Sequence, residues 1–393
     1  MSTHLQAFMD EIVEKRLAAG ALALVYQGGR EAAYAQSGWR VLNQAPFDRD
    51  TLCHMYSDTK VVTGALILHL AERGLIDLDA PLADYLPEYA HMQVVEGDEA
   101  SGFHLTAARR PLTVFHLLTM TSGIPYTENS GGALGQVSAA QAALDLRAGQ
   151  DERAGRPWTT LDFARALAQC PLLFHPGDRW HYGLSCDVLG GLAEAVTGKR
   201  LGELMREAIF EPLGMNSTAF HPEQLDASRL AVIYDGALQP WQDGRSGIRM
   251  TDSPDFEAGG AGLISCADDF MRFGRALLNG GELDGVRILS PESVRLMTQN
   301  HLTPEQMPSF DWPDEAGYGY GFTVRVMQNP SLSKYPERPG SFGWNGMAGT
   351  SLRLDPQRDL AVVFMTQRVG EGEGIDLPRL MQALYLDGIA ESV

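Results

Sequence analysis

The sequence predicts an α+β fold in which segments from both ends of the chain build one antiparallel sheet. Strand-like segments are concentrated near the two ends, at residues 21–27, 31–37, 318–327, 341–344, 350–354 and 360–365. Helix-compatible apolar spacing, interrupted by loops, dominates the stretch from about 75 to 260. Because strands and helices are segregated in this order, we expect a sheet flanked by helices together with a mostly helical insert.

The N-terminal elements follow from apolar spacing and turn residues. Apolar side chains recur on one side of residues 4–19, which predicts an amphipathic helix. The first two strands are joined through Gly28 and Gly29, a signal for a tight hairpin. A further apolar run predicts a helix over 57–73 that ends at Gly74.

The remaining elements are predicted by the same signals. Helices are expected at 112–120, 160–168, 187–196 and 377–386. The last two strands flank the turn sequence at 355–359. We expect residues 1–75 and 261–393 to form a discontinuous α/β sheet domain and 76–260 to form a mainly helical domain. The active site is then expected at the seam between them.

Composition restricts the class of partner. The 393 residues carry a formal net charge of −19, which disfavours nucleic acid and anionic membranes because both need a basic protein face. No stretch is long and apolar enough to span a membrane, and no secretory signal is visible, so a cytoplasmic location is expected. A small molecule is the expected partner, and the oligomeric state is left open.

Metal and disulfide chemistry are not indicated by the sequence. The four cysteines show no close pairing and no metal-ligand spacing, which favours free thiols. The ten histidines include no His-Glu-x-x-His pattern, and we interpret His175 and His181 as a solvated pair. No metal is therefore expected.

The strongest chemical signal is Ser-Asp-Thr-Lys at residues 57–60, at the start of an apolar helical run. Residues three apart on a helix share a face, so Ser57 and Lys60 would point the same way. A serine hydroxyl is a weak nucleophile until a base takes its proton, and burial can lower the pKa of a lysine enough for that role. Alternatively, Ser57 caps the helix while Lys60 extends to water. A second Ser-x-x-Lys occurs at 331–334, between two prolines that prevent a helix from running through it. We interpret this second copy as a chance match, which shows that the pattern alone is not specific.

Acyl transfer also needs a proton relay and donors for the developing oxyanion. Tyr182 lies after the Pro176-Gly177 turn and before a helix, so it could project into a cleft beside an ammonium group. The alternative is a tyrosine packed at a helix start. The glycine-rich segment 343–350 could bring a strand backbone close to a substrate, or could simply be a turn with a core tryptophan.

Two rival motifs are incomplete. Residues 183–187 nearly match the Gly-x-Ser-x-Gly nucleophile elbow but end in aspartate and follow no strand. Residues 259–262 are glycine-rich but lack the Gly-Lys-Ser/Thr ending of a phosphate-binding loop.

Taken in this order, the segments resemble the serine β-lactamase and penicillin-binding-protein superfamily, with the strongest likeness to class C β-lactamases and family VIII carboxylesterases. Besides 57–60, the resemblance is carried by residues 116–123, 174–180, 212–215, 259–265 and 317–321. It covers nearly the whole chain and implies a β-lactamase/DD-peptidase-like fold and no cofactor. It also implies that Ser57 is the nucleophile, that Lys60 and Tyr182 jointly transfer protons, and that the N–H groups of Ser57 and Met347 form the oxyanion hole.

Two departures from the lactamase pattern bear on the substrate. Leu184 replaces the Asn of Tyr-x-Asn, and Trp344-Asn345-Gly346 replaces Lys-Thr-Gly. The missing contacts are worth roughly 1.5–3 kcal/mol for the charged one and roughly 0.5–1.5 kcal/mol for the neutral one. This would weaken binding of peptide-like carboxylates by about a hundredfold or more. These four residues, with Tyr126, are expected to contact the substrate.

We therefore expect a cofactor-free serine carboxylesterase that acts on short or medium acyl esters through an acyl-enzyme. Within the same fold, a β-lactamase, a D-amino-acid peptidase or amidase, or an acyltransferase is the alternative. A catalytically silent binding or regulatory member is the alternative from a different functional class.

Overall fold

The computed structural model describes residues 3–98, 100–126, 157–241, 255–370 and 374–389. Its main sheet has eight antiparallel strands in the order β10-β11-β12-β13-β14-β1-β2-β3. These strands are β1 (Gly20–Gln27), β2 (Arg30–Val41), β3 (Ala45–Pro46), β10 (Tyr318–Tyr320), β11 (Arg325–Met327), β12 (Phe342–Asn345), β13 (Ser351–Asp355) and β14 (Leu360–Thr366). The predicted sheet built from both ends of the chain is thus confirmed.

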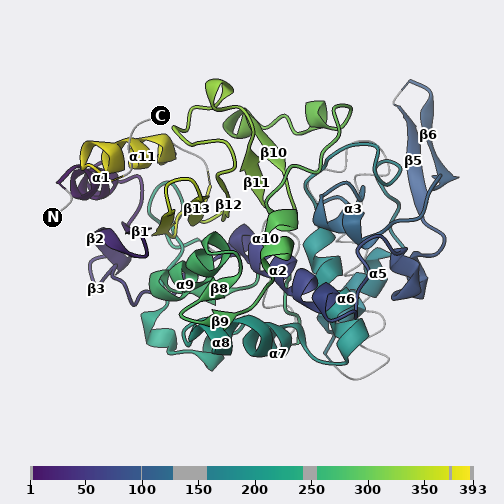
Figure 1. Ribbon diagram of the computed structural model, residues 1–393, viewed down its shortest axis with the longest axis horizontal. Helices are drawn as coiled ribbons and strands as arrows, with labels where there is room; N and C mark the ends of the chain where they lie inside the picture. The colour runs from purple at the N-terminus through teal and green to yellow at the C-terminus, as the bar shows by residue number, and fades with distance from the viewer. Residues whose placement is uncertain (1–2, 99, 127–156, 242–254, 371–373, 390–393) are drawn as a thin grey trace.

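The two ends of the chain meet where β1 pairs with β14. In this register Leu22 lies opposite Met365, and Ala23 lies opposite Phe364. Both strands are apolar almost throughout because both faces of the sheet are covered. One face packs on α1 (Thr3–Glu14) and α11 (Leu377–Leu386), which lie together near both termini in Figure 1. The other face joins the main core.

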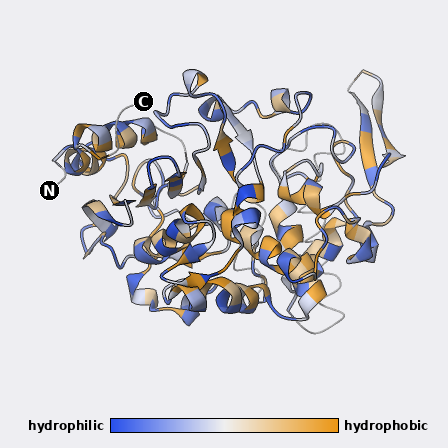
Figure 2. Ribbon diagram, in the orientation of Figure 1, coloured by the Kyte–Doolittle hydropathy of each residue, from blue (hydrophilic) through white to orange (hydrophobic). Residues whose placement is uncertain are grey.

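The helical part of the molecule surrounds α2, the helix that follows the candidate nucleophile. Its helices are α2 (Thr59–Glu72), α3 (Val114–Leu118), α5 (Thr160–Leu167), α6 (Ser185–Thr197), α7 (Leu201–Met205), α8 (Glu211–Leu213) and α10 (Pro291–Met297). A further helix, α9 (Ala267–Leu278), packs against β14 of the main sheet. Helix α2 packs against α6 and is buried along nearly its whole length. Figure 2 shows apolar residues concentrated in the helices around α5 and α6. A helix apolar on all sides fits this central position.

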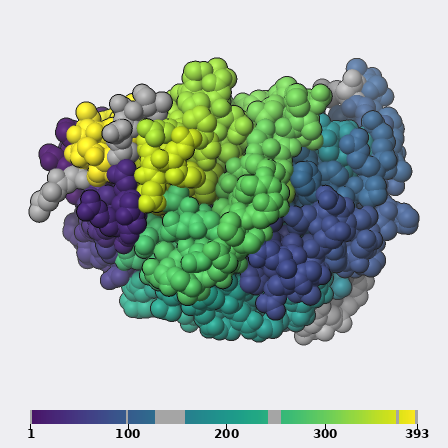
Figure 3. Space-filling view, in the orientation of Figure 1, coloured from purple at the N-terminus to yellow at the C-terminus, as the bar shows by residue number. Residues whose placement is uncertain are grey.

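Short strand pairs complete the described chain. They are β4 (Cys53–His54) with β7 (Ile264–Ser265), β5 (Gln93–Asp98) with β6 (Gly102–Ala107), and β8 (Glu282–Leu283) with β9 (Val286–Arg287). The β5–β6 hairpin projects from the helical side in Figure 1 and was not predicted. In Figure 3 the purple N-terminal and yellow C-terminal segments occupy the same end of the surface. None of the helices described here has the length and apolar character needed to cross a membrane.

Several predicted boundaries need correction. The segment 318–327 is not one strand, because the chain reverses between β10 and β11 and Thr323 adopts a left-handed φ of 61°. The first helix ends at Glu14 and not at 19, and Arg16 likewise has a left-handed φ of 58°. The helix predicted over 57–73 begins as a single 3₁₀ turn, η1 (Tyr56–Asp58), which continues into α2.

Candidate active site

Ser57 lies in the η1 turn, immediately before α2. The preceding Tyr56 adopts a left-handed φ of 44°, a strained conformation for a non-glycine residue. Lys60 lies in the first turn of α2, and its Nζ is 3.1 Å from Ser57 Oγ. The i,i+3 spacing therefore brings the two side chains into contact, as the sequence predicted.

Lys60 is fully buried, and its ammonium group has an acceptor for each of its three protons. Besides Ser57, Nζ donates to the hydroxyl of Tyr126 at 2.8 Å and to the carbonyl of Gly260 at 2.6 Å. Burial lowers the pKa of Lys60, but the neighbouring Tyr126 and Tyr182 oxygens raise it, and the net direction is upward. The expectation that burial would lower this pKa is thus wrong, because oxygen atoms surround the amine. A neutral amine could still donate to Gly260 and Tyr126 while its lone pair faces Ser57.

Tyr182 lies over Lys60 at the start of α6. Lys60 Nζ is 4.7 Å from the centre of the Tyr182 ring. The indole Nε1 of Trp344 donates a hydrogen bond to the Tyr182 hydroxyl at 3.0 Å. Within the described ranges, no hydrogen bond joins Tyr182 to Ser57 or Lys60. Tyr182 is therefore close to the pair and oriented by Trp344, and its role in proton transfer stays a prediction.

Tyr126, predicted only to line the pocket, contacts the lysine directly. Burial raises the pKa of the Tyr126 phenol, so the group stays protonated at neutral pH. Its ring lies 5.5 Å from that of Tyr182. The two tyrosines and Gly260 thus enclose the amine of Lys60 and hold it beside Ser57.

Gly260 was missed as a site residue because its contribution is made by the backbone. Its carbonyl accepts from Lys60, and its N–H donates to Asp187 Oδ1 at 3.2 Å. Burial raises the pKa of Asp187, which sits in the first turn of α6. A backbone carbonyl has no side-chain signature, although the glycine cluster at 259–262 was a visible sign of a close approach.

The turn after β12 carries the predicted oxyanion donor, the N–H of Met347. Gly346 packs so closely on the nucleophile turn that an added Cβ would lie 2.3 Å from the Met55 carbonyl oxygen. Its N–H donates to the Thr350 carbonyl at 2.8 Å, which closes the turn. The side chain of Met347 is exposed. The turn thus lies against the segment that holds Ser57, and the role of its N–H groups stays a prediction.

The other predicted substrate contacts differ in their accessibility. Trp344 is buried and packs on Tyr182, while Asn345 is partly buried. Asn345 Oδ1 accepts from Arg325 at 3.0 Å and from Ser351 Oγ at 2.8 Å, so its Nδ2 carries the protons left for other contacts. Leu184 is 2% exposed and belongs to the main core. Its substrate contact stays a prediction that this burial does not support.

Trp312 is an aromatic neighbour of the site that sequence reasoning missed. Its ring centre lies 4.9 Å from that of Tyr182 in an edge-to-face arrangement and 6.2 Å from that of Trp344. The side chain is 37% exposed, unlike Trp344. It comes from a loop between α10 and β10 that carries no motif, so only the three-dimensional contact identifies it.

The second Ser-x-x-Lys motif and the histidines do not form an alternative site in the described structure. Lys334, from the second Ser-x-x-Lys, is exposed and pairs with Asp314 at 2.6 Å, next to the short η9 turn (Pro330–Leu332). His175 is buried, with Nε2 2.8 Å from Glu96 Oε1, so interpreting it as solvated was wrong. Across the residues that the structure describes, no group of three or more His, Cys, Asp or Glu side chains could hold a metal ion.

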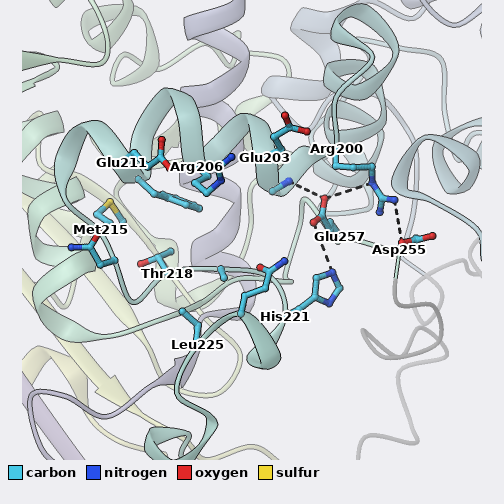
Figure 4. A pocket seen from close by; sticks show the side chains of 15 residues that line it. Arg200, Glu203, Arg206, Glu211, Met215, Thr218, His221, Leu225, Asp255 and Glu257 are labelled. Carbon is cyan, nitrogen blue, oxygen red and sulfur yellow. Dashed lines mark hydrogen bonds and ion pairs between the residues drawn. The ribbon is translucent and has the colours of Figure 1, made fainter.

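A cavity of about 630 Å³ lies beside α7 and α8 (Figure 4). Its charged groups face one another: Arg200 Nε lies 4.0 Å from Glu257 Oε2, and His221 Nε2 lies 3.8 Å from Glu257 Oε1. None of the predicted catalytic residues lines it. The candidate active site is therefore the Ser57 cluster and not this cavity.

Known proteins are similar to this chain over nearly its whole length. The sequence profile of the beta-lactamase family matches residues 5–385. An uncharacterised protein of Mycobacterium tuberculosis is 34% identical over 92% of this chain and 89% of its own. Esterase EstB of Burkholderia gladioli is 29% identical over 95% of this chain and 92% of its own. The structure of EstCE1, described as a hydrolase with promiscuous acyltransferase activity, is 25% identical, covers 98% of both chains and superposes with a TM-score of 0.79.

Proposed function

The chain belongs to the beta-lactamase family, and we propose that it is a serine carboxylesterase that hydrolyses uncharged short- or medium-chain acyl esters through an acyl-enzyme. The observation that carries this proposal is the 3.1 Å contact between Lys60 Nζ and Ser57 Oγ beneath Tyr182 and Trp344. Esterase EstB, similar over nearly its full length, supports an ester-cleaving member, and EstCE1 supports a hydrolase of this fold.

In the first step, Ser57 Oγ attacks the ester carbonyl carbon while its proton passes to the Lys60–Tyr182 pair. The pair accepts this proton in the state that holds either a neutral amine or a phenolate, since an ammonium beside a phenol has no free site for it. The carbonyl oxygen becomes an oxyanion that the N–H groups of Ser57 and Met347 stabilise. The carbon–oxygen bond to the alcohol then breaks, and the alcohol leaves with the transferred proton. Water repeats the sequence on the acyl-Ser57 ester and releases the carboxylic acid.

The preference for uncharged esters rests on the residues around Trp344. An indole occupies the position at which the lactamase pattern has a cation for the substrate carboxylate. The nearby Arg325 cannot take over that role, because it is buried and bound to Glu315 and Asn345. A substrate carboxylate would therefore lose its hydration with no charged partner in return.

A fluorophosphonate probe tests the nucleophile, and a substrate comparison tests the preference. The probe should label Ser57 alone, and Ser57→Ala should abolish both labelling and turnover. Nitrophenyl esters should be turned over faster than nitrocefin or D-alanyl peptides under one condition. Labelling of another serine would refute the mechanism, and faster peptide turnover would reverse the assigned substrate class.

Acyl transfer to an added alcohol is the second candidate function, favoured by the description of EstCE1. The acyl-enzyme is the same, and the outcome depends on whether water or the alcohol attacks it. Measuring ester product against free acid at increasing alcohol concentration separates the two activities. A catalytically silent binding role is disfavoured, because Ser57 and Lys60 are both present and in contact.

The remaining expectations stay proposals. We propose two domains, a sheet domain formed by 1–75 with 261–393 and a helical domain formed by 76–260. In the described chain, every strand of the main sheet lies within 20–46 or 318–366, which supports this division. A cytoplasmic location is supported by the four cysteines, which are buried and form no disulfide in the described chain. A small-molecule ester is the proposed partner, with no nucleic acid or membrane.

A further inference from the structure

Asp58 follows the nucleophile directly, yet its carboxyl group is completely buried. Oδ2 lies 2.6 Å from Thr350 Oγ1, a contact across 292 residues of sequence. In the part of the chain that the structure describes, Oδ1 has no hydrogen-bond partner. The proposed esterase mechanism assigns no role to this group.

A count of protons at Thr350 indicates the state of the carboxyl group. Thr350 Oγ1 lies within hydrogen-bond distance of Asp58 Oδ2 and of the Met55 carbonyl, at 3.2 Å, but the hydroxyl has one proton to donate. If Asp58 is protonated, it donates to Thr350, and Thr350 donates to Met55. A neutral carboxyl therefore satisfies both contacts, whereas a carboxylate satisfies only one of them.

The electrostatic surroundings agree with a neutral carboxyl. Burial raises the pKa of Asp58 to about 7, although the hydrogen bond with Thr350 and the charges of Arg325, Arg353 and Lys60 lower it. The two arginines are engaged with Glu315 and Glu337, and Lys60 donates to Ser57, Tyr126 and Gly260. Desolvation therefore outweighs the attraction of these cations.

The contact connects the two turns that carry the predicted oxyanion donors. On one side are Met55 and Ser57; on the other, Thr350 closes the turn that contains Met347 through its carbonyl bond to Gly346. An added Cβ at Gly346 would meet both Thr350 Oγ1 and the Met55 carbonyl, which shows how closely the turns pack.

We propose that Asp58, in its protonated form, is a positioning residue that links the Ser57 turn to the Met347 turn through Thr350 and fixes the spacing of the oxyanion hole. This inference rests on the proposed esterase function. When Asp58 ionises, Thr350 turns its single proton to the carboxylate, the bond to Met55 is lost, and a negative charge develops beside the oxyanion. The rate of the chemical step then falls, while substrate binding is little affected.

The test measures kcat and KM for a nitrophenyl ester from pH 5.5 to 8.5 in wild type and Asp58→Asn. Asparagine keeps a neutral donor to Thr350 but cannot ionise. We expect the ratio of wild-type to variant kcat to fall about tenfold across this range, less than the roughly 100- to 1,000-fold cost of losing an oxyanion donor. KM should stay within about twofold. Taking the ratio cancels the pH effects that both proteins share.

Asp269→Asn is the matched control, because Asp269 is also buried and also bonds a threonine, Thr218, at 2.9 Å. Its kcat ratio to wild type should not vary with pH. At Thr350, serine keeps the hydroxyl and should retain most of kcat, whereas the isosteric Thr350→Val should lower kcat about tenfold. Thermal unfolding of each variant checks that the fold is kept.

A flat or rising wild-type to Asp58→Asn ratio overturns the proposal, as does a folded Thr350→Val with wild-type kcat. If Thr350→Val does not fold, the Asp58→Asn ratio decides alone. Fluorophosphonate labelling separates the two levels of inference. If wild type is not labelled on Ser57, the esterase function fails; if it is labelled and the ratio is flat, only the role of Asp58 fails.

Discussion

The indole N–H of Trp344 donates a hydrogen bond to the hydroxyl oxygen of Tyr182, and their ring centres are 5.5 Å apart. The same tryptophan that replaces a substrate-binding cation thus orients the proposed proton-relay tyrosine. The proposed substrate preference and the proposed proton transfer thus both depend on this one side chain.

Replacing Trp344 by phenylalanine keeps an aromatic ring but removes the N–H donor. We expect kcat for a nitrophenyl ester to fall about tenfold, because the net value of such a hydrogen bond is about 1 kcal/mol and the tyrosine loses its orientation. KM should change less than kcat. Trp39→Phe, at a half-exposed tryptophan outside the site, should leave both constants unchanged. Equal losses in the two variants would contradict the role of the bond.

Substituting Lys60 by methionine keeps most of the side-chain volume and removes the amine. We expect kcat/KM to fall by roughly 100- to 10,000-fold, the usual range for a lost proton-transfer group. Lys334→Met, in the second Ser-x-x-Lys, is the control and should be as active as wild type. Steady-state ester hydrolysis measures kcat/KM of both variants. If Lys60→Met retains more than a tenth of the wild-type value, Lys60 is not a proton-transfer group in the reaction.

Trp312 offers an exposed aromatic face next to Tyr182. Its replacement by alanine should raise KM for medium-chain esters more than for acetate esters, since a longer acyl chain has more apolar surface to bury. The expected difference is about threefold to tenfold, equivalent to roughly 25–55 Å² of apolar surface. A series of nitrophenyl esters of increasing chain length measures it, and an equal change at every length would show that Trp312 does not bind the acyl chain.

Gly346→Ala should inactivate the enzyme without unfolding it. The new Cβ would lie 2.2 Å from Thr350 Oγ1 and 2.3 Å from the Met55 carbonyl oxygen, so the turn must shift. We expect kcat/KM to fall by about 100-fold or more, as for the loss of an oxyanion donor. Gly374→Ala, where an added Cβ meets nothing within 4 Å, should be neutral. Ester hydrolysis and circular dichroism together distinguish inactivation from unfolding.

The stability of the protein should depend on pH through Asp58. Its pKa is raised by burial to about 7, so between about pH 4 and pH 7 the folded protein holds a proton that the unfolded chain has released. The free energy of unfolding therefore falls as pH rises through this window, by up to about 4 kcal/mol. Urea unfolding at pH 4.5 and pH 8 should show a smaller pH effect in Asp58→Asn. An identical pH effect in both proteins would mean that Asp58 does not titrate there.

Contacts between residues that are close together in the sequence could be predicted from it. The contact between Ser57 and Lys60 follows from helical spacing, and the closing helix has its predicted bounds, Leu377–Leu386. Contacts between distant residues were not predictable. The Gly260 carbonyl reaches Lys60 from 200 residues away, and its backbone oxygen is common to every residue type. The predicted direction of the Lys60 pKa shift was wrong for the same reason, because Tyr126, which contacts the amine, lies 66 residues further along the chain.

The position of β14 between β13 and β1 has a consequence for biosynthesis. The nucleophile turn leaves the ribosome before the turn with Met347 and before β14, the strand that pairs with β13 after that turn. A nascent chain that already carries Ser57, Lys60 and Tyr182 still lacks half of the proposed oxyanion hole. Hydrolytic activity should therefore begin only after β14 has been made, so chains that terminate before it would be inactive toward the proposed ester substrates.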